Sequence, residues 1–400
     1  MLIGIFSDTH FGFGSDDRNK EAFDRFDEAI NIFKENNVDF ILHAGDLFDE
    51  AVPKQEVWLR TFNCFNKNNG KVSFIEKNHF AEKSVVEAKG IPIIAIHGTH
   101  EFRGKDFANA LDILEEANCL VHVHAGYAKL EKNGEEVFVH GMGGIPEKNA
   151  RDALFKYSPI PFPNKTNLLL LHQSFKEFLP FDDESIASLS LGDLPNGFDL
   201  IINGHLHWRD EQNIDGKRFL LTGSTIFTQM KKLEAQKEKG VFLFDSSTKQ
   251  INFIPFKNQR KLFYEKIVFK DAVPEDIIKT VEEKIKFILL QKNEIKPLIR
   301  FNLKGTLAKG FSQKDILINL SDFEEKAIFS ISKEFDLVEF QKKIEYLKKL
   351  QLEKKSILDM GIDILEKNIS EAKLEGFDTR RVFELLSNDE MEKAEELLLK

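Results

Sequence analysis

Metal-ligand side chains recur along this chain in five short groups that lie far apart in the sequence. Nearly every group directly follows a short apolar run of the kind that forms a β-strand. Several strands could therefore deliver their carboxyl ends, and these side chains, to one place. The groups are Asp8-Thr9-His10, Gly45-Asp46, Gly98-Thr99-His100-Glu101, His172 and Gly204-His205-Leu206-His207.

The chemistry that this set favours is hydrolysis of a phosphate ester by two divalent metal ions. The reaction needs charge stabilisation on the attacking and leaving oxygens and a supply of hydroxide, which two ions about 3.5 to 4 Å apart provide. Asp46 is the natural bridging carboxylate, and Gly45 lets the backbone come close. Asp8 and His10 could bind one ion together. The nitrogen ligands that complete the shell favour manganese or iron, and also suit zinc: His172, His205 and His207.

Each group taken alone has an ordinary explanation. Gly-Asp most often marks a hairpin or loop, Gly-His-x-His could form a turn, and many Asp-x-His triplets lie on surfaces. Their joint occurrence in this order, after apolar runs, favours the metal site. Asn78-His79 lacks a preceding glycine, so we interpret it as unrelated to the site. The remaining histidines flank or occupy expected strands and are interpreted as structural: His43, His97, His122, His124 and His140.

Strands and helices alternate through the first two thirds of the chain, which indicates an α/β fold with helices outside a sheet. Between the first two strands, apolar residues from Ala22 to Phe33 recur at helical spacing, so this crossover buries one face of a helix. Gln55–Asn66 and Lys105–Ala117 are predicted as further helices. The predicted strands are Leu2–Phe6, Phe40–His43, Ile91–Ile96, Val137–Val139, Asn167–Leu171, Leu200–Ile202, Arg218–Leu221 and Gly240–Phe244.

The character of the sequence changes after about Asn258, where a small α+β domain is predicted. From Glu334 onward the chain is heavily charged, and apolar residues repeat at helical spacing before two shorter helices. We therefore predict three domains, at residues 1–257, 258–333 and 334–400. The elements expected in the α+β domain are strands Leu262–Phe269, Leu298–Leu303 and Ala327–Ser332 and helix Pro274–Ile288.

The composition argues against a disulfide-rich, a membrane-spanning or a secreted protein. The chain has 400 residues, a net charge of −10 and two cysteines, which fit neither a zinc site nor a disulfide scaffold. The apolar runs are far shorter than the roughly 18 residues that a membrane span needs, and the start lacks the basic region of a signal peptide. We therefore expect a cytoplasmic protein with no membrane segment. The acidic charge counts mildly against nucleic acid as a partner, although bound metals and local patches can outweigh it.

The ordered set resembles the calcineurin-like metallophosphoesterase superfamily. Within it, the chain is similar to the double-strand-break repair nucleases of the meiotic-recombination-eleven and SbcD family, in its archaeal form. This resemblance implies a two-sheet β-sandwich flanked by helices, with a small α+β capping domain and a C-terminal helical segment. The narrower likeness rests on Ser7-Asp8-Thr9-His10-Phe11-Gly12, Gly45-Asp46-Leu47-Phe48-Asp49 with Pro53, His172-Gln173 and Gly223-Ser224-Thr225.

The resemblance also implies roles for individual side chains. His100 would approach the scissile phosphate and protonate or stabilise the leaving oxygen, as suits an imidazole near neutral pH. Asp49 would support the site or contact DNA. Two manganese ions per chain are implied, with iron, zinc or magnesium as substitutes. One ion would be held by Asp8, His10, Asp46 and His207, and the other by Asp46, Thr99, His172 and His205.

Thr99 departs from the family pattern, which has Asn at this position. Its hydroxyl is a neutral oxygen donor but reaches less far than a carboxamide. Binding of the second ion therefore requires the loop to move inward or a water molecule to bridge.

The function implied by the resemblance is a manganese-dependent DNA nuclease of a double-strand-break processing complex. It would act as a 3'-5' exonuclease on duplex ends and an endonuclease on single strands, associated with DNA in the cytoplasm. Residues 334–400 would bind an SbcC-type ABC ATPase. A homodimer would pair through the helices at 55–66 and 105–117, whose Trp58, Phe62 and Phe65 are either exposed for pairing or part of the core. The alternatives are hydrolysis of a small phosphodiester or phosphoprotein, and a catalytically weakened scaffold.

Overall fold

The computed structural model describes residues 1–79, 82–104, 107–179, 189–257, 259–337, 361–362, 365–366, 378–387 and 390–398. These residues divide into two compact units, and each is described by itself. The first unit consists of Met1–Tyr264, Leu289–Arg300 and Phe323–Ser330. The second contains Glu265–Ile288, Phe301–Asp322 and the described residues from Ile331 onward. Within the described part of the chain, no helix has the length and apolar character to cross a membrane.

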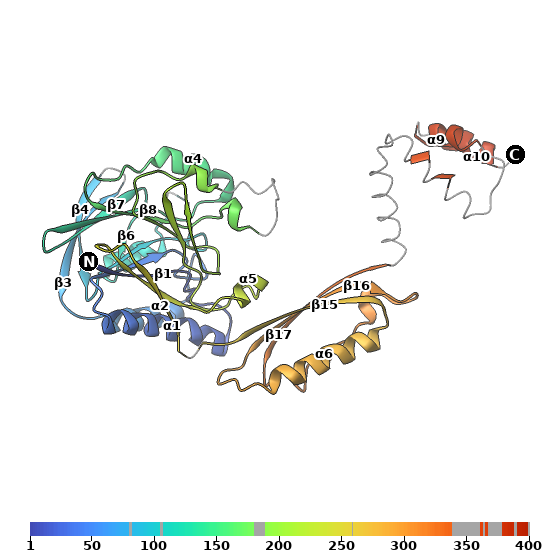
Figure 1. Cartoon of the computed structure of the whole chain (residues 1–400), viewed down its shortest axis with the longest axis horizontal. Helices are drawn as coiled ribbons and strands as arrows, with labels where there is room; N and C mark the ends of the chain where they lie inside the picture. The colour runs from blue at the N-terminus through green and yellow to red at the C-terminus, as the bar shows by residue number, and fades with distance from the viewer. Residues whose placement is uncertain are drawn as a thin grey trace. The chain divides into compact units, whose positions relative to one another are not determined.

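A six-stranded sheet forms one layer of the first unit (Figure 1). Its strands, in spatial order, are β14 (Ile251–Pro255), β13 (Gly240–Asp245), β1 (Leu2–Phe6), β2 (Phe40–Ala44), β5 (Ile93–Ile96) and β6 (Val121–His122). From β1 to β6 the neighbours run parallel, whereas β13 is antiparallel to both β1 and β14. The carboxyl ends of β1, β2 and β5 therefore lie at the same edge of this sheet.

An eight-stranded sheet forms the second layer. Its strands, in spatial order, are β11 (Asp210–Ile214), β12 (Lys217–Leu221), β10 (Leu200–Asn203), β9 (Thr166–Leu171), β8 (Glu135–Met142), β7 (Gly126–Lys132), β3 (Val72–His79) and β4 (Glu82–Lys89). The central strands β8, β9, β10 and β12 run parallel, and the outer pairs are antiparallel. This sheet also presents a set of carboxyl ends at one edge.

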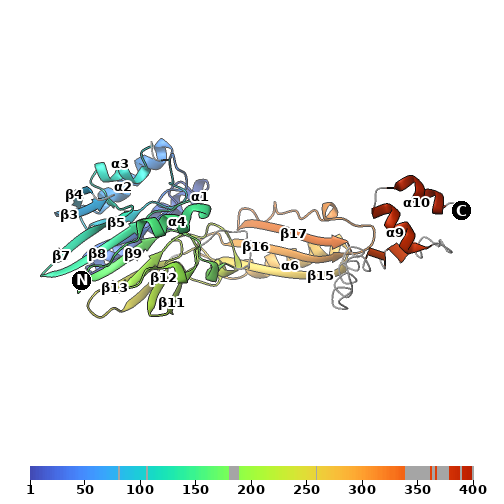
Figure 2. The ribbon, with the colours of Figure 1, turned by 90° about the horizontal axis from the view of Figure 1, so that it is seen from above.

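The two sheets pack face to face through apolar residues of their central strands. Ile5 and Leu42 of the first sheet share one buried cluster with Leu168 and Ile202 of the second. Helices cover both outer faces of the sandwich, as Figure 1 shows, and Figure 2 gives the view from above. α1 (Asp16–Glu35), α2 (Gln55–Lys67) and α3 (Ala110–Glu116) pack on the six-stranded sheet, and α4 (Glu147–Tyr157) packs on the eight-stranded one. The predicted two-sheet sandwich flanked by helices is confirmed.

All eight strands predicted in the first two thirds are present, with ends shifted by a few residues. The strands that were missed include polar ones such as β4, whose side chains are mostly exposed, and the edge strands β6 and β14. α3 begins later than predicted, because the Asn109 side chain accepts the backbone N–H of Leu111 at 2.9 Å and caps the helix there. Lys105, the predicted start, lies outside the described residues. On α2, Phe65 is buried and Trp58 and Phe62 are partly buried against the same cluster, so these residues belong to the core.

The second unit contains most of a three-stranded sheet of β15 (Leu262–Ala272), β16 (Leu298–Leu307) and β17 (Ile328–Leu337). α6 (Pro274–Leu289) buries Ile277, Val281 and Ile285 along one face. These elements match the predicted strands and helix of the α+β domain. The predicted helical repeat between Leu337 and Ile369 falls largely outside the described residues. The remaining short elements are η1 (Lys176–Phe178), η2 (Leu191–Asp193), α5 (Lys232–Ala235), η3 (Gln313–Asp315), α9 (Thr379–Ser387) and α10 (Met391–Leu398).

Candidate metal centre

The predicted site residues lie just beyond the carboxyl ends of parallel strands from both sheets. Asp8 and Asp46 follow β1 and β2, and Thr99 follows β5. His172 follows β9 and His205 follows β10, its parallel neighbour. Because the sheets pack together, these loops meet at one edge of the sandwich. The arrangement of the strands in the two sheets therefore brings these residues together, although they are far apart in the sequence.

The backbone at the site is held in an unusual conformation. Asp8 and His10 have φ of 51°, Asp46 has φ of 53° and His205 has φ of 75°. A left-handed backbone is uncommon for residues other than glycine and costs of order 1 to 3 kcal/mol each. Gly98 allows the closest approach, because a Cβ there would lie 2.0 Å from Asp46 Oδ1. Such strain is typical of sites where side chains must point at one spot.

A first group of ligand atoms comes from Asp8, His10 and His207, which lie within 4.8 Å of one another. The two imidazole Nε2 atoms of His10 and His207 are 3.2 Å apart, and His207 Nε2 is 3.7 Å from Asp8 Oδ1. His10 Nδ1 lies 3.0 Å from the Asp49 carboxylate, which only accepts hydrogen bonds when ionised. A proton on His10 Nδ1 satisfies this contact, and Nε2 is then the atom that faces His207 and could bind a metal ion.

A second group comes from Asp46, His172 and His205, again within 4.8 Å. His172 Nδ1 donates to the Ala44 carbonyl at 2.7 Å, which directs Nε2 to Asp46 Oδ2 at 3.0 Å. The two groups are linked, because the backbone N–H of His205 donates to Asp8 Oδ1 at 3.0 Å. Carboxylate and imidazole donors converge on two adjacent points, so the residues present fit a pair of divalent cations.

Thr99 lies beside the second group. Its Oγ1 is 3.4 Å from His205 Nδ1, so the hydroxyl faces the same space as the imidazole. On its other side, His205 Nε2 is 3.5 Å from Glu147 Oε1 at the start of α4. Sequence reasoning missed Glu147, because a helix-starting glutamate in an unrelated segment carries no motif.

Burial and neighbouring charge set the protonation of the imidazoles. Burial lowers the pKa of His205 to about 3 and lowers the pKa of His207 well below its usual value, so both rings are neutral and can donate lone pairs. Burial also acts to lower the pKa of His172, but the charge of Asp46 outweighs it and raises that pKa to about 9. The second group therefore attracts positive charge, which a metal ion supplies in place of a proton.

His100 differs from the ligand candidates in its exposure. Its side chain is 43% exposed, and its Nδ1 donates to the Asp49 carbonyl at 2.7 Å. This contact turns Nε2 toward the site, where it lies 4.0 Å from Asp46 Oδ2. Asp49 thus orients both His10, through its carboxylate, and His100, through its carbonyl. The ring of His100 is in a position to reach a substrate that approaches the site from solvent.

Glu101 joins the two loops that carry Asp46 and Thr99. Its side chain is fully buried, and its two oxygens accept the backbone N–H groups of Phe48 at 2.7 Å and Gly98 at 2.6 Å. Burial raises the pKa of this carboxyl to about 7. The sequence placed Glu101 within its motif but did not indicate this role.

The histidines predicted to be structural lie outside both groups. His43 Nε2 lies 2.7 Å from Thr9 Oγ1 beneath the site, and His97 Nδ1 lies 3.0 Å from His122 Nε2. The ring of His140 packs edge-on against Phe198. His79 is in β3 rather than at the metal centre.

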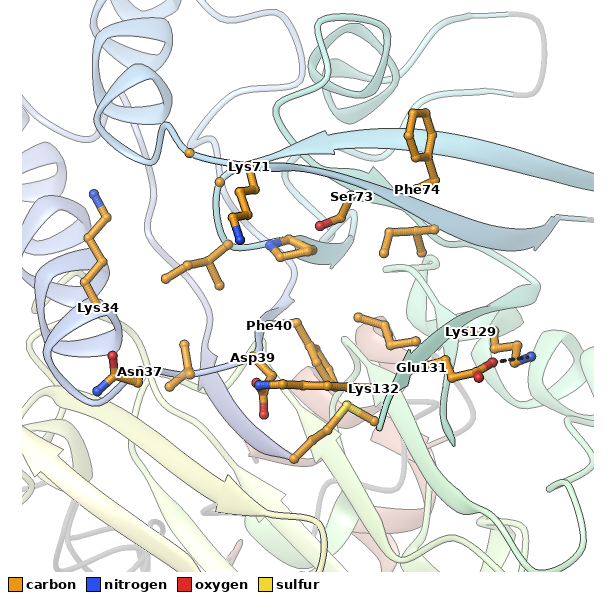
Figure 3. A pocket seen from close by; sticks show the side chains of 18 of the residues that line it. Lys34, Asn37, Asp39, Phe40, Lys71, Ser73, Phe74, Lys129, Glu131 and Lys132 are labelled. Atoms are coloured by element: carbon orange, nitrogen blue, oxygen red, sulfur yellow. Dashed lines mark hydrogen bonds and ion pairs between the residues drawn. The ribbon is translucent and has the colours of Figure 1, made fainter. Parts of the chain in front are cut away.

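A separate hollow of about 860 Å³ is lined by residues at the opposite ends of β1 and β2 (Figure 3). It contains none of the predicted site residues. Several of its charged side chains are paired with one another, as Lys132 is with Asp39 and Lys129 with Glu131. Its charges are therefore largely compensated, and we assign it no part in the metal chemistry.

Comparison with known proteins agrees with this geometry. A family model described as calcineurin-like phosphoesterase matches residues 1–209, slightly more than half of the chain. A Thermoplasma acidophilum protein named DNA double-strand break repair protein Mre11 is 29% identical over 339 residues, which is 81% of each chain. A Sulfolobus acidocaldarius protein of the same name is 28% identical over 415 residues, covering 100% of this chain and 98% of the relative.

Proposed function

Since the chain belongs to the calcineurin-like phosphoesterase family, we propose that it is a manganese-dependent DNA nuclease that processes double-strand breaks. It acts as a 3'-5' exonuclease on duplex ends and as an endonuclease on single strands. The observation that carries this proposal is the convergence of Asp8, His10 and His207 with Asp46, His172 and His205 at one edge of the sandwich. The DNA substrate is inferred from relatives named as double-strand break repair proteins.

Each group of side chains would hold one divalent ion, with Asp46 shared between them. Bound there, two ions would neutralise the phosphate and supply hydroxide at neutral pH. Asp49 and Ala44 fix the rings of His10 and His172 through their Nδ1 atoms, so both Nε2 atoms already point at the site. Thr99 contributes its hydroxyl beside His205.

His100 would act on the leaving oxygen. With Nδ1 held by the Asp49 carbonyl, its Nε2 is free to present a proton to a phosphodiester in the site. A positioned general acid of this kind typically contributes 10²- to 10⁴-fold in rate. The exposure of the ring suits contact with a large substrate.

The test is cleavage of end-labelled duplex DNA with added manganese, comparing the wild type with His100→Ala. We expect metal-dependent cleavage by the wild type and a loss of about 10²- to 10⁴-fold in the variant. Manganese binding measured by calorimetry should stay close to that of the wild type, because His100 is not a ligand. A variant that cuts DNA normally would contradict the role of His100.

The two alternatives make different predictions in the same assay. A phosphoesterase for small substrates would turn over a small phosphodiester as well as DNA and would need nothing beyond Pro255. A scaffold protein whose catalysis is weakened by Thr99 would show no metal-dependent cleavage by the wild type.

We also propose that residues 258–333 form a domain that holds DNA, that residues 334–400 bind an SbcC-type ABC ATPase, and that the chain forms a homodimer.

A further inference from the structure

A buried ion pair lies behind the metal centre and has no part in the chemistry described above. Lys239 and Glu234 have side chains that are 4% and 0% exposed, and their Nζ and Oε1 atoms are 3.0 Å apart. Burying two charges costs several kcal/mol of desolvation per ion, so such a pair is a poor device for stability alone. The hydrogen bonds that the pair makes to neighbouring groups indicate another role for it.

The ammonium group of Lys239 uses all three of its donors. Besides Glu234, it donates to Ser224 Oγ at 2.8 Å and to the backbone carbonyl of His207 at 2.6 Å. The same nitrogen lies 4.7 Å from the centre of the Phe227 ring. Lys239 therefore donates a hydrogen bond directly to the main chain of His207, a candidate metal ligand.

The carboxylate of Glu234 reaches the side chain of the same histidine by another route. Its oxygens accept the backbone N–H groups of Thr228 at 3.1 Å and Gln229 at 3.2 Å. The hydroxyl of Thr228 in turn contacts His207 Nδ1. The contacts thus form a closed circuit that runs from the His207 carbonyl through Lys239, Glu234 and Thr228 to the His207 ring.

The circuit is anchored to the sheet that carries Asp8. Lys239 directly precedes β13, which pairs with β1. Its backbone is fixed on both sides, since its N–H donates to Gln259 Oε1 at 2.8 Å and its carbonyl accepts from Phe256 at 3.0 Å. The position of His207 is therefore tied, through β13, to β1, the strand that precedes Asp8.

We propose that Lys239, Glu234 and Thr228 are positioning residues that hold the imidazole of His207 with Nε2 aimed at the first metal ion. This inference rests on the proposed function, in which His207 is a ligand. The three residues touch neither metal nor substrate. Partners of this kind around a metal ligand typically contribute 10- to 100-fold in metal affinity or activity.

The most direct test is Thr228→Val, which removes the hydroxyl at His207 Nδ1 and keeps the shape of the side chain. Calorimetry on the metal-free full chain should show manganese affinity weakened by about 10- to 100-fold. The melting temperature without metal should stay close to that of the wild type. Thr228→Ser, which restores a hydroxyl, should return affinity to near the wild-type value.

Lys239→Met tests the other half of the circuit, with Lys77→Met as the matched control. Lys77 is also buried and forms an ion pair with the partly buried Glu115, 2.7 Å away, but no contact described for it involves a metal-ligand candidate. We expect both variants to melt at lower temperature, and only Lys239→Met to bind manganese more weakly. Nitrogen NMR of the histidine rings provides a second measure, because loss of the circuit should change the tautomer signal of His207.

Wild-type manganese affinity in both Thr228→Val and Lys239→Met would overturn the inference. Equal loss of affinity in Lys77→Met would also overturn it, because a general loss of stability would then explain the effect. Metal affinity is measured separately from DNA cleavage. A wild type that binds manganese without cutting DNA would therefore count against the nuclease proposal, while the variants still decide this inference.

Discussion

At the scale of single residues, the site depends on what lies behind each candidate ligand. Asp49 sets the tautomer of His10, the Ala44 carbonyl sets that of His172, and Thr228 contacts the corresponding nitrogen of His207. Each ring therefore presents Nε2 toward the space between the carboxylates. Left-handed backbone at Asp8 and Asp46 turns their side chains to the same space. Orientation of this kind reduces the reorganisation needed when an ion binds.

Thr99 is the position where a single substitution should increase the affinity of the site for metal. Thr99→Asn adds a longer side chain with a carbonyl oxygen, and we expect it to tighten the weaker manganese site by about tenfold, or about 1.4 kcal/mol. Thr99→Val, which keeps the shape but removes the hydroxyl, should weaken the same site. Calorimetric titration of both variants measures the effect. Unchanged stoichiometry and affinity in both would show that the second ion is insensitive to this side chain.

The identities of the predicted ligands could be read from the sequence, because their residue types and order follow from the chemistry of metal binding. Their supporting partners could not. Glu101 and Lys239 act through hydrogen bonds to backbone groups, whereas Thr228 acts through its hydroxyl on the His207 ring. Such contacts depend on loop paths that the sequence does not specify. Whether the assigned ligands bind metal in solution stays a prediction.

At the scale of elements, the apolar central strands were predictable, whereas edge strands such as β4, β6 and β14 were not. β9 has every residue buried, and its run of leucines marks it clearly. β3 and β4 pair along their whole length, yet β4 is mostly exposed and lacks a clear alternation. Its structure depends on pairing with β3 rather than on its own pattern. The loops that carry the candidate ligands follow the apolar strands, which explains why these residues were easier to locate than the edge strands.

The three-stranded sheet presents basic side chains on the face away from α6. Along β15, Lys266 and Lys270 are exposed, whereas Phe301 and Leu303 of β16 are fully buried. If this face contacts phosphates, Lys266→Gln/Lys270→Gln should weaken DNA binding and reduce its salt dependence by about two counterions. Lys279→Gln/Lys286→Gln on α6 changes the net charge equally and is the control. Binding isotherms at several salt concentrations would reject the assignment if both double variants behaved alike.

At the scale of the whole molecule, the proposed function is divided between chemistry at the strand ends and association through the C-terminal residues. The sequence places the boundary of the last domain at residue 334, but β17 continues to Leu337. Phe335 is buried, its carbonyl accepts from Gln313 at 2.8 Å, and Glu334 forms an ion pair with Lys304. A truncation meant to remove only the association segment must therefore leave residues 334–337 in place.

Two truncations separate folding from association. A chain ending at Leu337 should keep its melting temperature and its manganese-dependent cleavage of simple DNA, because the contacts described for Glu334 and Phe335 of β17 remain. It should no longer co-purify with an SbcC-type ATPase. A chain ending at Lys333 loses a buried phenylalanine, which typically costs 3 to 5 kcal/mol, and should melt at lower temperature. If the chain ending at Leu337 still bound the ATPase, the binding surface would lie in the remaining residues, and the helices beyond Leu337 would need another role.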